Sequence, residues 1–319
     1  MNSTLRDTNE KEERTVRKKI FLWVLSILGL LLLIGGIYVY RVYSNVSSTL
    51  DSVHQPLKRD KSEKRDQKIN LTDQKPISIL LMGVDQRGEE TGRSDSLMLF
   101  TLNPKTKSMK ITSIPRDSYT EIIGKGKKDK INHAYAFGGI DMAVKTVENF
   151  LDIPVDHYIE VNMEGFKDIV DAVGGVEVNN DLEFTSVGTH FEKGNLHLDG
   201  EKALKYSRMR YEDPRGDFGR QMRQRQVIQA VIKKGASVSS LASYGDVLKA
   251  IEKNVKTSLT QDQMFDIQKN YKDCMENSEE IQIPGDGHKA ADGIWYYYVP
   301  DAAKQDITNK LRAHLEVTK

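Results

Sequence analysis

Six arginines lie close together in the segment 205–226, KYSRMRYEDPRGDFGRQMRQRQ. From residue 71 onward the chain otherwise prefers lysine, with 24 lysines against ten arginines. The planar guanidinium of arginine holds a carboxylate or phosphate through two parallel hydrogen bonds, whereas lysine offers a point charge. The segment therefore predicts either an oxyanion site or a solvated helix face whose arginines pair with neighbouring acids. The six residues are Arg208, Arg210, Arg215, Arg220, Arg223 and Arg225.

The spacing of these arginines indicates which of them can act together. Arg208 and Arg210 are two residues apart, so their side chains share a face only if the backbone around them is extended. Arg220 and Gln224 are four residues apart in a predicted helix and therefore lie on one face of it. Arg223 points elsewhere on that helix, and we expect a lysine in its place to change little.

A second polar group lies in GVDQRGEETGRSDS, residues 83–96. Asp85 and Asp95 flank a glycine-containing loop, and Arg87 and Arg93 lie in the same segment. Mg²⁺ usually takes one or two carboxylates and fills its other positions with water and phosphate oxygens. The segment predicts either a site for such a cation or a polar hairpin loop with two local ion pairs.

A third group follows the apolar run MKITSIP, where Arg116 and Asp117 come directly after Pro115. Proline cannot donate to a sheet ladder, so the strand is expected to end there and to present the next two side chains at the edge of the sheet. The segment KINHAYAFGG comes next, and Asn132 and Tyr135 in it are candidates to line a site.

The elements that must position these groups can be predicted from the apolar pattern. Short apolar runs predict strands at residues 77–85, on both sides of Asn103-Pro104, and at residues 157–162. Helical spacing of apolar residues predicts helices at residues 138–151, 163–173 and 217–235, and the final third mixes helices with two further strands. This order predicts a layered domain of the α/β (α+β) class, with a mixed central sheet and helices packed on both faces.

Composition excludes several kinds of function. The formal net charge of +1 over 319 residues argues against a general nucleic-acid binder. The single cysteine cannot form an internal disulfide, and no CxxC, HExxH or His/Cys cluster is present for zinc or iron–sulfur binding. Neither GxxxxGK[ST] nor GxSxG occurs, so nucleotide hydrolysis and serine-hydrolase chemistry are not supported.

The N-terminal region predicts a membrane anchor. Residues 20–40 carry no charge and match the roughly 20 residues that cross a bilayer, and three basic residues precede them directly. We therefore expect a cytoplasmic tail at residues 1–19 and a single transmembrane helix at 20–40, instead of a cleaved signal peptide. Residues 41–75 are polar and charged, which predicts an extracellular stalk, and residues 76–319 form the predicted extracellular domain.

Arginines and paired aspartates on a domain beside the outer leaflet suggest a divalent cation and a lipid-bound diphosphate. At these residues the chain resembles the LytR-CpsA-Psr family of bacterial cell-envelope proteins. The resemblance is carried by seven blocks that stand in the family's order over about residues 77–232: GVDQR, GRSDSLML, SIPRDS, KINHAYAFGG, VDAVGGVEV, LDGEKALKYSRMR and DFGRQMRQRQ.

The resemblance implies a phosphotransferase that moves a glycopolymer from an undecaprenyl diphosphate carrier to peptidoglycan. The anchor resembles that of family members that attach wall teichoic acid, which implies the membrane of a Gram-positive cell. By the same resemblance Asp85 and Asp95 hold Mg²⁺ or Mn²⁺. The diphosphate is held by Arg87, Arg116, Arg208, Arg210, Arg220 and Gln224, and the catalytic residues are Arg116, Arg208, Arg210 and Asp85.

Two other functions remain compatible with the sequence. A membrane-linked transcriptional regulator follows from older naming in this family, but a nineteen-residue tail without a helix-turn-helix pattern offers nothing to enter a DNA groove. A noncatalytic protein that binds envelope polymer would also need the arginines. Unlike a transferase, it would not depend on a metal ion. For the carrier's prenyl chain we expect an apolar groove between the sheet and helices such as residues 138–151.

Overall fold

The computed structural model describes residues 44, 46–85, 92–236 and 241–317. Within them, Thr49–Lys319 forms one compact unit built on a six-stranded mixed sheet. The two central strands, β1 and β2, are antiparallel, whereas β1 runs parallel to β6 and β3 runs parallel to β12. In spatial order the strands are β11 (Val255–Thr257), β6 (His157–Asn162), β1 (Ile77–Asp85), β2 (Arg93–Asn103), β3 (Ser108–Ser113) and β12 (Ser278–Gln282).

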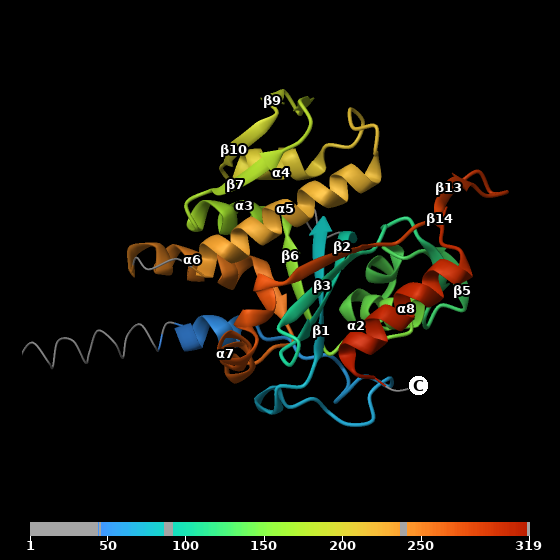
Figure 1. Cartoon of the computed structure of the whole chain (residues 1–319), viewed down its shortest axis with the longest axis horizontal. Helices are drawn as coiled ribbons and strands as arrows, with labels where there is room; N and C mark the ends of the chain where they lie inside the picture. Colours follow the sequence, from blue (N-terminus) through green and yellow to red (C-terminus); the bar gives the residue numbers. More distant parts are fainter. Residues whose placement is uncertain (1–43, 45, 86–91, 237–240, 318–319) are drawn as a thin grey trace, which may run out of the picture. The chain divides into compact units, whose positions relative to one another are not determined.

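Helices cover both faces of this sheet (Figure 1). On one face, α2 (His133–Leu151) and α8 (Asp301–Leu315) pack on Leu80, Met82 and Leu99. On the other face, α5 (Asp217–Ala236), α7 (Gln261–Asn270) and the 3₁₀ turn η2 (Lys272–Glu276) lie over Ile79 and Phe100. The central strands are buried on both sides, which explains why their sequences read as continuous apolar runs instead of alternating.

A smaller layer stands beyond the carboxyl end of β1. It contains α3 (Met163–Ala172), α4 (Gly200–Arg208), the strand pair β7 (Val176–Asn180) and β10 (Gly194–Leu198), and the hairpin of β8 (Phe184–Ser186) and β9 (Thr189–Phe191). α3 begins directly after β6, because the side chain of Asn162 accepts a hydrogen bond from the backbone N–H of Gly165 at 2.7 Å. Asp199 caps α4 in the same way through the N–H of Lys202.

The remaining elements lie at the edges of the unit. These are α6 (Leu241–Asn254), the 3₁₀ turn η1 (Leu71–Asp73), and the hairpins of β4 (Tyr119–Ile122) with β5 (Lys127–Lys130) and of β13 (Asp286–Lys289) with β14 (Trp295–Tyr298). The predicted strands and helices are therefore present, with β2 and β3 joined across Asn103-Pro104 as expected.

Residues 49–75 differ from the expected stalk, because they lie in the compact unit. The guanidinium of Arg59 hydrogen-bonds Glu148 at 3.0 Å, and Arg65 pairs with Asp156 at 2.7 Å. Leu71 is buried in the core beneath the sheet. The many charges of this segment predicted that it would be solvated. Two of its arginines instead form ion pairs with carboxylates of the compact unit.

The predicted cytoplasmic tail, residues 1–19, and the predicted anchor, residues 20–40, lie outside the described residues. Among the residues that are described, no helix is both long and apolar enough to cross a membrane.

Candidate active site

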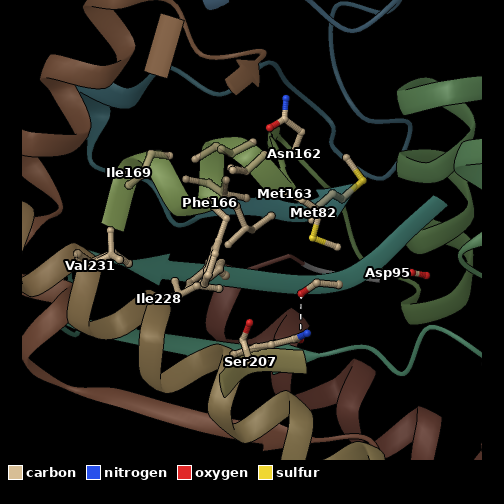
Figure 2. A pocket seen from close by; sticks show the side chains of 18 of the residues that line it. Met82, Asp95, Asn162, Met163, Phe166, Ile169, Ser207, Ile228 and Val231 are labelled. Atoms are coloured by element: carbon tan, nitrogen blue, oxygen red, sulfur yellow. Dashed lines mark hydrogen bonds between the residues drawn. The ribbon is translucent and has the colours of Figure 1, made fainter. Parts of the chain in front are cut away.

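A cavity of about 900 Å³ lies between the sheet and the helices α3, α4, α5 and α7. Figure 2 shows Asp95 at one end of it, with Ile169 and Val231 toward the other. Most of its wall is apolar and comes from the strands as well as the helices. The apolar lining includes Ile79, Leu81, Phe100, Leu102, Met109, Ile159, Phe166, Ile169, Ile228, Val231, Met264, Ile267 and Met275.

The polar end of the cavity brings together seven of the eight residues predicted for the site. They come from segments far apart in the sequence, and their side chains meet because the carboxyl end of β1, the start of β2 and the ends of α4 and α5 converge. The eighth, Arg87, lies outside the described residues. The seven are Asp85, Asp95, Arg116, Arg208, Arg210, Arg220 and Gln224.

A β-bulge precedes Asp85. The pairing of β1 with β2 shifts register between Gly83 and Val84, so that Asp85 stands opposite Arg93 at the end of the ladder. A Cβ at Gly83 would lie 3.1 Å from the Cβ of Ser96, which is tighter than ordinary contact. Glycine thus lets β1 approach β2 closely where both strands line the cavity.

Asp95 and Arg116 form an ion pair at the polar end. One guanidinium nitrogen of Arg116 lies 3.0 Å from Oδ1 of Asp95, and the side-chain amide of Asn132 donates to the same oxygen at 3.2 Å. Asn132, expected as a lining residue, therefore supports Asp95. Asp117 pairs with Lys130 at 2.8 Å, and its other carboxylate oxygen lies 3.8 Å from Nε of Arg116. Tyr135, the other expected lining residue, is buried in the core on the opposite face of the sheet.

Arg220 and Gln224 both face the cavity from α5, as their spacing predicted. The hydroxyl of Ser96 donates to the side-chain oxygen of Gln224 at 3.1 Å. Burial lowers the pKa of Arg220, and the charges of Arg116 and Arg210 lower it further, although Asp217 opposes them. Nε of Arg220 and Nε of Arg116 are buried without a hydrogen-bond partner among the described residues. A cluster of cations with unused donors favours an anionic ligand.

Arg208 and Arg210 reach the cavity from the end of α4, not from an extended strand. Arg208 is the last residue of the helix, and the chain becomes extended at Met209, with φ −59° and ψ 134°. This single change of backbone direction lets both arginines line the same cavity. Tyr211, which follows them, is 95% exposed and also lines it.

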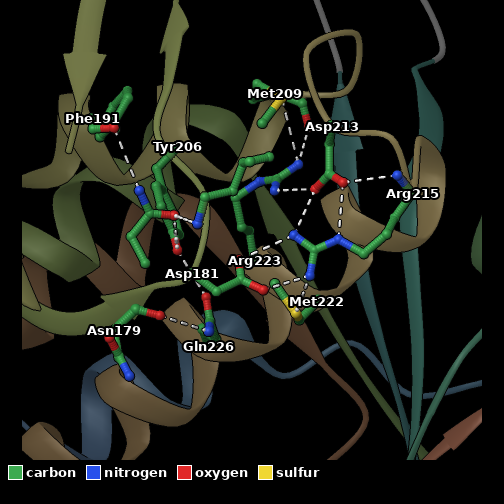
Figure 3. A network of polar contacts seen from close by, with 12 residues as sticks. Asn179, Asp181, Phe191, Tyr206, Met209, Asp213, Arg215, Met222, Arg223 and Gln226 are labelled. Carbon is green, nitrogen blue, oxygen red and sulfur yellow. Dashed lines mark hydrogen bonds and ion pairs between the residues drawn. The ribbon is translucent and has the colours of Figure 1, made fainter. Parts of the chain in front are cut away.

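Arg223 is fully buried, which contradicts the expectation that a lysine would substitute for it freely (Figure 3). Its guanidinium donates to Asp213 and to the backbone carbonyl of Met209, both at 2.7 Å. Arg215 binds the same carboxylate at 2.9 Å from the solvent side. The pair therefore fixes both ends of the short loop that carries Arg210.

The arginine cluster thus divides into two parts. Arg208, Arg210 and Arg220 line the cavity, whereas Arg215, Arg223 and Arg225 form ion pairs with Asp181, Asp213 and Glu280. The alternative of ion pairs with neighbouring acids is met in part, because Arg215 and Arg223 pair with Asp213 and Arg220 pairs with Asp217. Arg220, Arg223 and Arg225 are nevertheless buried instead of solvated.

The expected position of the apolar groove was wrong. The helix at residues 138–151 belongs to α2, which packs as plain core on the face opposite the cavity. The cavity lies against α3, α5 and α7 instead. Sequence reasoning also missed Ser96, Ser207 and Tyr211 in the lining, because a serine or a single tyrosine beside a strand or helix end carries no pattern of its own.

The donor set at the polar end fits a hard cation only in part. Asp85 and Asp95 are its two carboxylates, and no group of three or more His, Cys, Asp or Glu residues occurs among the residues that the structure describes. A protein cage of carboxylates is thus absent from that part of the chain. Two carboxylates suit Mg²⁺ if phosphate oxygens and water complete its coordination.

Comparison with known proteins identifies the family. The LytR_cpsA_psr family profile matches residues 40–313, and the chain belongs to this family. It is 73% identical, over 95% of its length and 100% of the relative, to the polyisoprenyl-teichoic acid–peptidoglycan teichoic acid transferase TagU of Bacillus mycoides.

Solved structures agree with this assignment. The crystal structure of B. subtilis TagU superposes with a TM-score of 0.62 at 50% identity, covering 77% of this chain and 99% of that one. A structure described as TagT bound to LI-WTA gives a TM-score of 0.70 at 33% identity, covering 83% of this chain and 100% of that one.

Proposed function

We propose that this protein is a transferase that moves a teichoic acid glycopolymer from an undecaprenyl diphosphate carrier to peptidoglycan. One observation carries the proposal: a single cavity joins an arginine- and aspartate-lined end to a long apolar interior. A prenyl diphosphate has the same division, with charge at one end and hydrocarbon along the rest. The names of the relatives, which are teichoic acid transferases, support the same polymer and acceptor.

The reaction exchanges one phosphoester link for another. A hydroxyl of peptidoglycan attacks the phosphorus that carries the glycopolymer, the new P–O bond forms, and the bridging P–O bond to the prenyl phosphate breaks. Prenyl phosphate leaves, and the hydroxyl's proton passes to a carboxylate. Asp85 is our candidate for that carboxylate, because it ends β1 and lines the polar end of the cavity beside the arginines.

The arginines hold the diphosphate in line and stabilise the charge that develops on its oxygens. Arg208 and Arg210 approach from the end of α4, Arg116 from the end of β3, and Arg220 with Gln224 from α5. Phosphoryl transfer depends mainly on such positioning and on charge stabilisation. When Mg²⁺ or Mn²⁺ is bound at Asp85 and Asp95, it supplies further neutralisation of the phosphate oxygens.

The proposed place of action is the outer face of the cell membrane of a Gram-positive bacterium. The uncharged run at residues 20–40 and the basic residues before it support a single-pass anchor with the compact unit outside.

The direct test gives the full chain, reconstituted in vesicles, a prenyl-diphosphate-linked glycan and peptidoglycan fragments. Mass spectrometry should detect the glycan joined to peptidoglycan through a phosphodiester, together with prenyl phosphate. Asp85→Ala and Asp95→Ala should each remove the product while leaving the unfolding temperature near wild type. A noncatalytic binder would retain the lipid and form no product, and equal turnover in excess chelator would contradict the metal's role.

A further inference from the structure

The apolar end of the cavity reaches the protein surface at α7 and η2. Along β2 the lining runs from Asp95 at the polar end to Leu102, seven residues that span about 23 Å. At that distant end Met275 both lines the cavity and is 38% exposed, so the cavity opens there. Phe265, on α7 beside this opening, is 42% exposed and does not line the cavity.

The wall formed by α7 is loosely packed. None of its ten residues is buried, although Met264 and Ile267 line the cavity. The other walls rest on strands and helices with fully buried residues. α7 is therefore the side of the cavity at which an apolar chain is most readily admitted.

The same end receives the chain from the predicted anchor. The backbone N–H of Gln55 donates to the carbonyl of Thr257 at 2.7 Å, and a ring nitrogen of His54 lies 3.1 Å from the carbonyl oxygen of Leu259. α7 starts two residues after Leu259. Eight residues lie between residue 40, the end of the predicted anchor, and Thr49, where the compact unit begins. This connection spans at most about 30 Å.

We propose that the α7–η2 face, marked by Phe265 and Met275, contacts the outer leaflet and that the distal part of the prenyl chain passes between bilayer and cavity there. The proposal rests on the proposed function and on the predicted anchor. An undecaprenyl chain exceeds the cavity when extended, and each methylene exposed to water costs about 0.8 kcal/mol. An opening against the bilayer keeps the protruding part in hydrocarbon.

The contact is apolar instead of electrostatic. Residues 261–276 carry two lysines and four acidic residues, so the face has no excess of basic residues to attract anionic lipid headgroups. Its occupant is accordingly the hydrocarbon of the bilayer, and binding should not depend on anionic lipid.

The first test reports contact directly. In full-length protein with Trp23→Phe, a tryptophan placed by Phe265→Trp is compared with one placed by Ile294→Trp, which replaces another exposed apolar residue far along the chain. Vesicles of zwitterionic phosphatidylcholine with brominated acyl chains should quench Phe265→Trp at least twice as strongly. Equal quenching would overturn the proposal, as would a dimer that buries position 265 without lipid quenching.

The second test measures how contact between the α7–η2 face and the bilayer affects transfer. Phe265→Ser should raise KM about fivefold for a long-chain donor embedded in the bilayer and leave a short-chain, water-soluble donor within twofold of wild type. Ile294→Ser should change neither. Equal loss with both donors would overturn the role of the face. Absence of transfer by wild-type protein with either donor would instead refute the proposed function, while the quenching result would still decide where the bilayer lies.

Discussion

At the residue scale, the site depends on guanidinium groups that crowd one end of a cavity. Arg116 and Arg210 lie close enough to Arg220 for their charges to lower its pKa, whereas Asp217 and Asp95 act in the opposite direction. A diphosphate bound there, as we propose, would relieve the repulsion among the arginines as well as accept hydrogen bonds from them. The geometry of the fork then decides how well the phosphate is oriented.

Arginine-to-lysine substitutions keep the positive charge but remove the paired guanidinium donors, so they test whether these donors orient the phosphate. Arg208→Lys and Arg210→Lys should each lower turnover roughly ten- to hundredfold, because one hydrogen bond to a charged group is worth about 1.5–3 kcal/mol. Arg312→Lys on α8, which binds Asp152 away from the cavity, is the matched control and should keep wild-type turnover. Transfer rates within threefold of wild type for both site variants would argue that the arginines do not hold the diphosphate through paired bonds.

The buried carboxylate of Asp213 makes stability depend on pH. Burial raises the pKa of Asp213, but hydrogen bonds from Arg215 and Arg223 outweigh it and lower the pKa to about 2. A group with a lowered pKa stabilises the fold above its unfolded pKa of about 3.9, and that contribution is lost as pH falls toward 2. Chemical denaturation should show this loss between about pH 4 and pH 2. Asp213→Asn should be less stable at neutral pH and should lose less in that range; an unchanged pH profile would contradict the assignment.

At the element scale, the sequence predicted what periodicity and caps determine. The strands β1, β2, β3 and β6 and the helices α3 and α5 were predictable, because apolar runs end in glycine, proline or a capping residue. Helical spacing also separated Arg223 from the cavity-facing side of α5. It could not reveal that Met209 and Asp213 lie against that other side, because this depends on how α4 packs on α5.

The same limit explains why the expected position of the apolar groove was wrong. Helical spacing of apolar residues marks both α2 and α5, and only the packing of whole layers leaves space beside one and fills the space beside the other. Arginine and aspartate near strand and helix ends indicated which side chains gather at the polar end of the cavity, although the same residue types in Arg223 and Asp213 form a structural ion pair. An apolar cavity has no such signature, as apolar residues that line a space look like those that fill one.

Filling the cavity from α5 tests the role of that helix. Val231→Trp adds bulk inside the apolar interior, so KM for a long-prenyl donor should rise at least tenfold, while a donor with a short chain should be used almost normally. Lys233→Trp, at an exposed position on the same helix, is the matched control. If both donors lost activity in parallel without a change in unfolding temperature, the cavity would not be the site of the prenyl chain.

At the scale of the whole molecule, the predicted orientation of the anchor can be tested directly. Protease added to intact protoplasts should digest the compact unit and leave the first residues protected, because the basic residues before residue 20 favour the cytoplasmic side. Immunoblotting with N- and C-terminal tags reads the outcome. A C-terminal tag that survives in intact protoplasts and disappears only after lysis would reverse the predicted orientation.

The ion-paired segment before β1 also has a mechanical consequence. In the proposed reaction, a polymer newly joined to the wall while its donor end is still held would pull the compact unit away from the predicted anchor. Tension arriving at Thr49 first meets the contacts of Gln55 with Thr257, of Arg59 with Glu148 and of Arg65 with Asp156. These contacts bear the load in series before it reaches Ile77, so the hydrogen-bonded centre of the sheet, and with it the alignment of Asp85, is shielded from force along the chain.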